Sequence, residues 1–154
     1  MNEEGVAWLQ NRMREWRDLI DLLFEAITCT LKKEVSSILK VENLLDPKNG
    51  EPLDGLLWPL GIKNYIFIKA HPEDPNIEAS TLLHEVLHIN FEHRQPKDDS
   101  FIIKLESALW GQFSESQRRM IRDFIPEELS PESSTPELEV IEETFPEPIL
   151  EIPK

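Results

Sequence analysis

The sequence feature that most constrains this chain is a nine-residue stretch containing two histidines and a glutamate, Thr81-Leu82-Leu83-His84-Glu85-Val86-Leu87-His88-Ile89. Its apolar residues predict a helix with a wide buried face. Residues four apart lie on the same face of a helix, so His84 and His88 can direct two imidazoles at one ion. This arrangement suits tetrahedral zinc. Glu85 follows the first histidine, and its carboxylate can accept a proton from a bound water whose pKa zinc has lowered towards ~7.

The alternative interpretation of this stretch is a half-buried helix with polar residues at its rim. Two histidines and a glutamate on a mostly buried helix are unfavourable unless they have partners. We therefore favour metal binding, with His84 and His88 as ligands and Glu85 as the catalytic base.

The composition predicts one compact domain, residues 1–125, followed by a tail, residues 126–154. The chain has 154 residues, 40% of them hydrophobic, and a single cysteine, Cys29, which suits a reducing cytoplasm. The formal charge of −14 argues against nucleic-acid binding. The acidic N-terminus does not match a secretory signal, and no apolar run approaches the ~20 residues that span a bilayer. We expect a soluble cytoplasmic protein without a membrane partner.

The first third of the chain has a helical pattern of apolar residues at steps of three and four, namely Leu9, Met13, Trp16, Ile20, Leu23, Ile27 and Leu31. The pattern predicts a helix from about Val6 to about Leu39, with a break near residues 28–30 as an option. We expect this stripe to pack within its own domain, and a coiled-coil or partner-binding surface is the alternative.

The region that follows contains the only segments with a clear strand pattern. Asp46 to Gly50 predict a turn. Residues 56–58 and 65–69 are short apolar runs on either side of a predicted hairpin turn. If the second run is the edge of a small sheet beside the metal, its free backbone groups could bind an extended peptide; the alternative is an ordinary paired strand. Asn76 or Asp74 is the expected N-cap of the next helix.

A third protein ligand is expected after the motif. A second amphipathic helix is predicted from Phe101, Ile102, Leu105, Leu109 and Phe113, and it contains Glu106, with seventeen residues between it and His88. A returning helix can bring this glutamate to the metal, and we favour it as ligand. His93 could reach the ion only if the helix that carries His84 and His88 ends near residue 90 or 91. Asp98 and Asp99 are further alternatives. Ser114 and Gln117 then predict a capping box that begins a last helix, closed by Pro126.

The order of these elements resembles the compact gluzincins, and in particular the ImmA/IrrE-like metallopeptidases common in phages and mobile elements. Residues 81–88 are similar to that family's active-site helix, and residues 105–109 to the segment that carries its third ligand. The resemblance implies an α+β zincin-like fold: a long N-terminal helix, a short sheet or hairpin, the His-Glu-x-x-His helix and further helices. It also implies that His84, His88 and Glu106 bind zinc while Glu85 acts as general base. Tyr65 and His71 are the candidates for stabilising the oxyanion.

The tail contains six prolines, nine glutamates and one lysine, so it carries −8 of the total charge. This composition predicts disorder. Its expected role is solubilising. Alternatively, residues 138–141 or 149–152 inhibit the enzyme, or the tail docks a regulatory partner.

These observations predict a zinc-dependent metallopeptidase that cleaves a specific protein or peptide substrate. The alternative is a non-catalytic regulatory protein that retains the metal-binding helix and binds partners.

Overall fold

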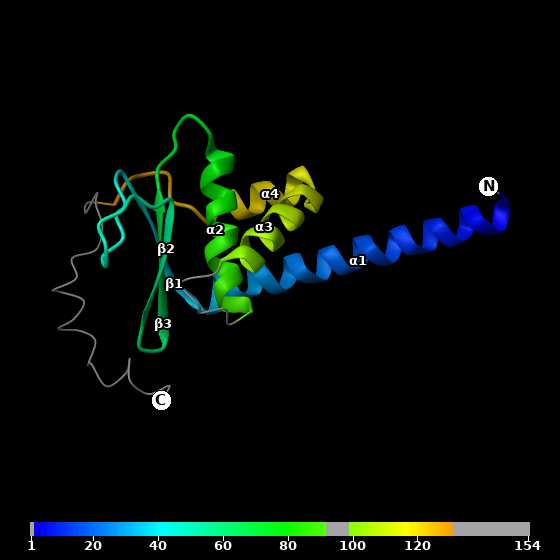
Figure 1. The fold of residues 1–154 in the computed structure, drawn as a ribbon, viewed down its shortest axis with the longest axis horizontal. Helices are drawn as coiled ribbons and strands as arrows, with labels where there is room; N and C mark the ends of the chain where they lie inside the picture. The colour runs from blue at the N-terminus through cyan, green and yellow to red at the C-terminus, as the bar shows by residue number, and fades with distance from the viewer. Residues whose placement is uncertain (1, 92–98, 131–154) are drawn as a thin grey trace.

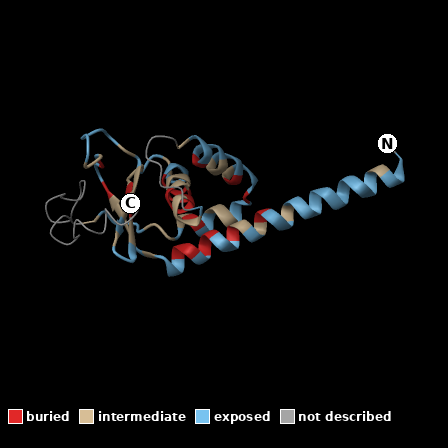
Figure 2. Cartoon of the chain, turned by 60° about the horizontal axis from the view of Figure 1, so that its bottom comes forward, coloured by how far each residue is buried: buried red, intermediate tan, exposed pale blue. Residues whose placement is uncertain are grey.

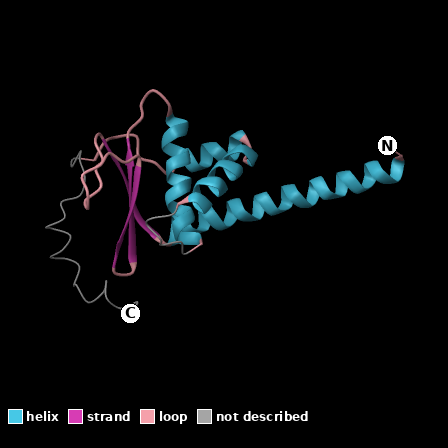
Figure 3. Ribbon diagram, in the orientation of Figure 1, coloured by secondary structure: helices cyan, strands magenta, loops and turns pink. Residues whose placement is uncertain are grey.

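The described part of the chain has an α+β fold, with four helices and a three-stranded sheet (Figure 1). The computed structural model describes residues 2–91 and 99–130. The elements are α1 (Glu3–Lys33), β1 (Val35–Val41), β2 (Gly55–Leu60), β3 (Lys63–Lys69), α2 (Pro75–Asn90), α3 (Ser100–Gln112) and α4 (Glu115–Arg122). Figure 3 shows the sheet on one side of α2 and the other helices on the opposite side.

Helix α1 is continuous over 31 residues, so the break proposed near residues 28–30 is wrong. It ends at Lys33, and the predicted extension of the helix to Leu39 is wrong as well. Residues 35–41 instead form β1, which pairs in parallel with β3. The sheet therefore includes β1 in addition to the two strands predicted after residue 50.

The sheet has the order β1-β3-β2, with β2 antiparallel to β3. The predicted hairpin is confirmed: Leu60 pairs with Lys63 across a two-residue turn. Gly61 has a φ of +64° in this turn, a conformation that glycine adopts without steric penalty. Because β3 is the central strand, residues 65–69 form an ordinary paired strand, the second of the two alternatives, and not an edge. The described edges of the sheet are β1 and β2.

Helix α2 is the centre of the domain, because it contacts β2, β3 and all three other helices. A helix in this position must be apolar around most of its circumference. Its core residues are all fully buried: Ala79, Leu82, Leu83, Val86 and Leu87. The remaining core side chains come from the C-terminal half of α1, from β3 and from α3 and α4, and include Ile20, Ile27, Ile66, Ile68, Ile102, Leu109 and Ile121.

The predicted turns and caps are largely confirmed. The Gly50 N–H donates to the Asp46 carbonyl and closes the turn after β1. Asp74, rather than Asn76, is the N-cap of α2, and it accepts from the Asn76 N–H at 3.0 Å. Ser114 and Gln117 form the expected capping box of α4. The predicted tail can be examined only to residue 130, and residues 131–154, with their inhibitory and docking segments, lie outside the described residues.

Candidate metal centre

The site is built on α2, which presents His84 and Glu85 on one turn and His88 on the next. The start of this helix is fixed by the Asp74 cap and by Glu78, whose buried carboxylate accepts the His71 backbone N–H at 2.7 Å. A helix fixed at its N-terminus and buried along its length holds its polar side chains in defined directions. Both histidine side chains are only 15% exposed.

The two histidines converge on one point through their Nε2 atoms, which are 3.3 Å apart. Asp99, at the N-cap position of α3, completes the group. Its Oδ2 lies 3.2 Å from His84 Nε2, and its Oδ1 lies 3.4 Å from His88 Nε2. The three side chains therefore form a triangle of donor atoms that could hold a metal ion.

The separation of the two imidazole nitrogens fits a tetrahedral ion. With ligand bonds of about 2.0–2.1 Å, two ligands on a tetrahedron are separated by about 3.3 Å. The two Nε2 atoms are 3.3 Å apart, and Asp99 approaches each histidine with a different carboxylate oxygen, at 3.2 and 3.4 Å. Two imidazoles and one carboxylate are a common donor set for zinc in hydrolytic sites.

Glu106 lies on the other side of the His84 ring. Its Oε1 is 3.4 Å from His84 Nδ1, whereas His88 and Asp99 lie at the other ring nitrogen, Nε2. A carboxylate at Nδ1 orients the ring and selects the tautomer that leaves Nε2 free to bind a metal. The structure thus brings Asp99, rather than Glu106, to the point where the two histidines meet. His93 and Asp98, the other candidates for third ligand, lie outside the described residues.

Asp99, together with Asp98, was favoured less than Glu106 and His93 as third ligand. It occupies the N-cap position of α3, but its side chain makes no capping hydrogen bond. Its carboxylate points to the histidines instead. The available signal was therefore an N-cap aspartate that lies eleven residues after His88.

Carboxylates surround His84 and raise its pKa. Burial lowers that pKa, but hydrogen bonding to Glu106, the charge of Glu85 and the Asp99 carboxylate together outweigh it. The same negative environment attracts a cation. Metal binding would displace any proton on Nε2, since imidazole binds metals in its neutral form.

Glu85 lies under strand β2 and is 8% exposed. Burial raises the pKa of its carboxyl to about 7, although the neighbouring His84 and the Leu57 backbone hydrogen bond both lower it. A carboxyl with a pKa near neutrality can exchange protons at physiological pH. The approach of β2 depends on Gly55, because a Cβ there would lie 2.5 Å from Thr81 Cγ2 and 3.1 Å from Glu85 Oε2.

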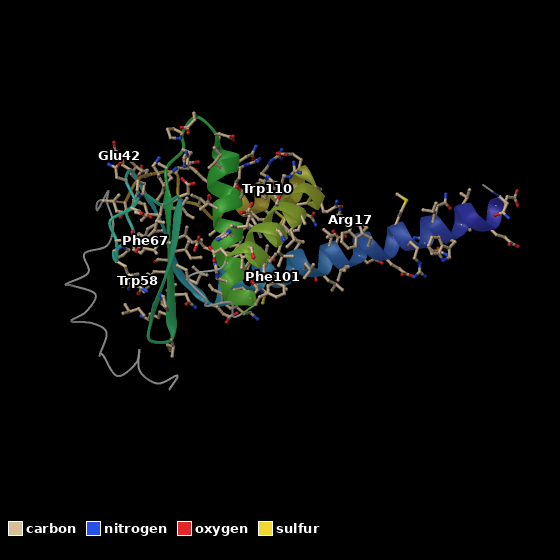
Figure 4. The ribbon with its side chains drawn as sticks, in the orientation of Figure 1. Arg17, Glu42, Trp58, Phe67, Phe101 and Trp110 are labelled. Carbon is tan, nitrogen blue, oxygen red and sulfur yellow. The ribbon has the colours of Figure 1, made fainter. Side chains whose placement is uncertain are left out.

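The two candidates for oxyanion stabilisation lie outside the metal-binding group. His71 precedes α2, and its ring nitrogens contact Glu73 at 2.9 Å and Asp54 at 3.1 Å. Tyr65 lies in the central strand, in register with Trp58 of β2 (labelled in Figure 4). A role for either residue in oxyanion stabilisation stays a prediction.

Comparisons with protein-family models, with curated proteins and with solved structures found no match. Among the helices of the described residues, none has the length and apolar character needed to cross a membrane.

Proposed function

We propose that this protein is a zinc-dependent metallopeptidase whose site is formed by His84, His88 and Asp99. The observation that carries the proposal is the convergence of His84 Nε2, His88 Nε2 and the Asp99 carboxylate, with the two imidazole nitrogens separated by the edge of a zinc tetrahedron. Two features support hydrolysis rather than a purely structural site. Glu85, directly after the first histidine, can act as general base. Structural zinc sites are usually closed by four protein ligands, whereas the three ligands among the described residues leave a fourth position for water.

In this proposal each side chain has a separate task. His84 and His88 bind through Nε2, and Asp99 supplies the negative charge. Glu106 holds the His84 ring in place from its Nδ1 side. Zinc bound here supplies Lewis-acid activation of water and of a substrate carbonyl. Glu85 takes a proton from the attacking water and passes it to the leaving amine.

Strand β2 is the proposed substrate-binding element. It is an edge strand of the described sheet, and the backbone of Leu57 hydrogen-bonds Glu85. An extended peptide added along β2 would therefore run beside the general base. Strand β3, for which peptide binding was one of two alternatives, is paired on both sides.

The test of the peptidase proposal is cleavage of a proteome-derived peptide library, with new termini mapped by mass spectrometry. The zinc-loaded wild type is expected to cut, and Glu85→Gln is expected to lose at least about 100-fold in rate while it still binds zinc. Glu78→Gln is the matched control, because this glutamate is buried in the same helix at 7% exposure, keeps an oxygen that can accept a hydrogen bond, and lies outside the group of His84, His88 and Asp99. Equal cleavage by wild type and Glu85→Gln would contradict the proposed mechanism. Zinc binding without any cleavage of the library or of folded protein substrates would favour the regulatory alternative.

A further inference from the structure

Helix α1 is much longer than the domain needs. Its buried residues begin at Ile20 and continue to Leu31, whereas almost every residue before Ile20 is exposed. Figures 1 and 2 show the N-terminal half of the helix extending away from the rest of the described chain. Arg17, labelled in Figure 4, marks the point of departure, where its Nη1 donates to the Gln112 carbonyl at 2.9 Å.

The exposed half carries an apolar surface, which we call the N-terminal stripe, formed by Val6, Leu9, Met13 and Trp16. Their exposures are 41%, 38%, 66% and 51%. Trp16 lies at the boundary with the domain, where its indole Nε1 donates to Gln112 Oε1 at 3.1 Å and leaves half of the side chain exposed. At 100° per residue these four lie within an arc of about 100° that also contains Ile20, Leu23 and Ile27 of the core-facing surface. The stripe therefore continues the surface that packs in the core, for about 20 Å beyond the domain.

This half of α1 has the properties of an interface that lacks its partner. A helical segment of about fourteen residues is marginally stable in water by itself. Spacings of three and four between Val6, Leu9, Met13 and Trp16 are those of a two-helix seam. A second helix with the same spacing would cover all four side chains.

The charges along α1 favour a second copy as the occupant. The first turn carries Glu3 and Glu4, whereas residues 12–18 carry three arginines against Glu15 and Asp18, a net charge of +1. An antiparallel pair of these helices brings the acidic end of each close to the net basic segment of the other, whereas a parallel pair aligns like charges. The antiparallel arrangement also keeps two bodies of a chain with charge −14 at opposite ends of the seam. The same net charge disfavours an anionic membrane as the occupant.

We propose that the N-terminal stripe is a self-association surface, on which the stripe of a second copy packs antiparallel. In this seam Leu9 faces Met13 of the second copy, and Val6 faces Trp16. A two-fold axis near residue 11 makes the contact isologous. Four apolar side chains per chain provide less than the standard interface of about 1,600 Å², so we expect a reversible dimer with a dissociation constant in the micromolar range.

The test is sedimentation equilibrium of the full chain from about 1 to about 200 µM, the range that brackets a micromolar dissociation constant. The wild type is expected to dimerise as concentration rises, and Leu9→Asp with Met13→Asp to raise the dissociation constant at least about 30-fold. The matched control is Ala7→Asp with Asn11→Asp, which adds the same charges at the same spacing on the opposite, exposed face. This control should dimerise like the wild type.

Two outcomes would overturn the proposal directly. One is a wild type that stays monomeric throughout this range, whether or not it binds vesicles of phosphatidylserine and phosphatidylcholine. The other is a control variant that is weakened as much as the stripe variant.

Orientation is tested by cross-linking in a Cys29→Ser background, since Cys29 is exposed. A Leu9→Cys chain mixed with a Met13→Cys chain should form a disulfide-linked pair, and Val6→Cys alone should not. Efficient Val6→Cys self-cross-linking would show a parallel pair and contradict the antiparallel seam.

Discussion

Replacement of Gly55 by alanine tests how closely β2 must approach α2. A Cβ at this position would lie 2.5 Å from the Thr81 Cγ2 methyl group and 3.2 Å from Glu85 Cγ. The threonine cannot turn away freely, because its Oγ1 donates to the Ile77 carbonyl at 2.7 Å. Overpacking of this kind lowers the free energy of unfolding by about 1–3 kcal/mol. The reduced entropy of the unfolded chain returns about 0.4–1 kcal/mol.

We therefore expect Gly55→Ala to lower stability by about 1.3 kcal/mol, or the Tm by roughly 5 °C for a domain of this size. The assay is urea unfolding followed by circular dichroism. Gly111→Ala is the matched control, because nothing lies within 4 Å of the Cβ it adds in α3. That variant should be stabilised by up to about 1 kcal/mol.

Thr81→Ser identifies the contact responsible. Serine keeps the hydroxyl that bonds Ile77 but lacks the methyl group that the new Cβ would meet. In this background Gly55→Ala should lower stability by at least about 1 kcal/mol less than it does in the wild type. Strictly additive effects, or an unchanged stability of Gly55→Ala, would refute the argument that this glycine sets the distance between β2 and α2.

Three further changes have defined expected results. Ser114→Ala removes half of the capping box of α4 and should lower the free energy of unfolding by about 1 kcal/mol, and an unchanged urea midpoint would contradict this role. Hydrogen bonding to Glu73 is the main cause of the raised pKa of His71, so the stability it contributes is complete below pH 6.5 and is lost as pH rises through the raised pKa. His71→Asn should remove that part of the pH dependence, and an identical pH profile would contradict it. In zinc-free protein, burial raises the pKa of Glu85 from 4.5 to about 7, so the wild type loses stability as pH rises through this interval. Glu85→Gln should be more stable than the wild type by roughly 3 kcal/mol above pH 8 and equal to it at pH 4, and parallel profiles would refute the assignment.

The sequence predicted elements whose signals are local. Caps at Asp74 and Ser114, the hairpin and the apolar faces of α2 and α3 were all recognisable from nearby residues. Strand β1 was predicted as helix because Leu31, Val35 and Ile38 continue the helical spacing of α1. Its strand conformation depends on parallel pairing with β3, a partner about 30 residues away. Such a contact leaves no local pattern in the chain.

The part of the site that lies on one helix was predicted from the sequence, and the part contributed by α3 was not. His84, Glu85 and His88 follow from spacing on one helix, and the structure brings the two histidines together as expected. The approach of Asp99 depends instead on the angle at which α3 meets α2, which the sequence does not encode locally. The relation of Glu106 to the Nδ1 atom of His84 depends on the same angle.

Metal content is the most direct test of the proposed site. Zinc is measured by inductively coupled plasma mass spectrometry after purification without chelator and reconstitution with zinc, for the wild type and for His84→Ala, Asp99→Asn and Glu106→Gln. The account predicts about one zinc per wild-type chain. It predicts loss of the metal in the first two variants, and retention with affinity weakened about 10–100-fold in Glu106→Gln. No zinc in the wild type would contradict the metal centre itself. Full retention in Asp99→Asn together with loss in Glu106→Gln would contradict the assignment of Asp99 as third ligand.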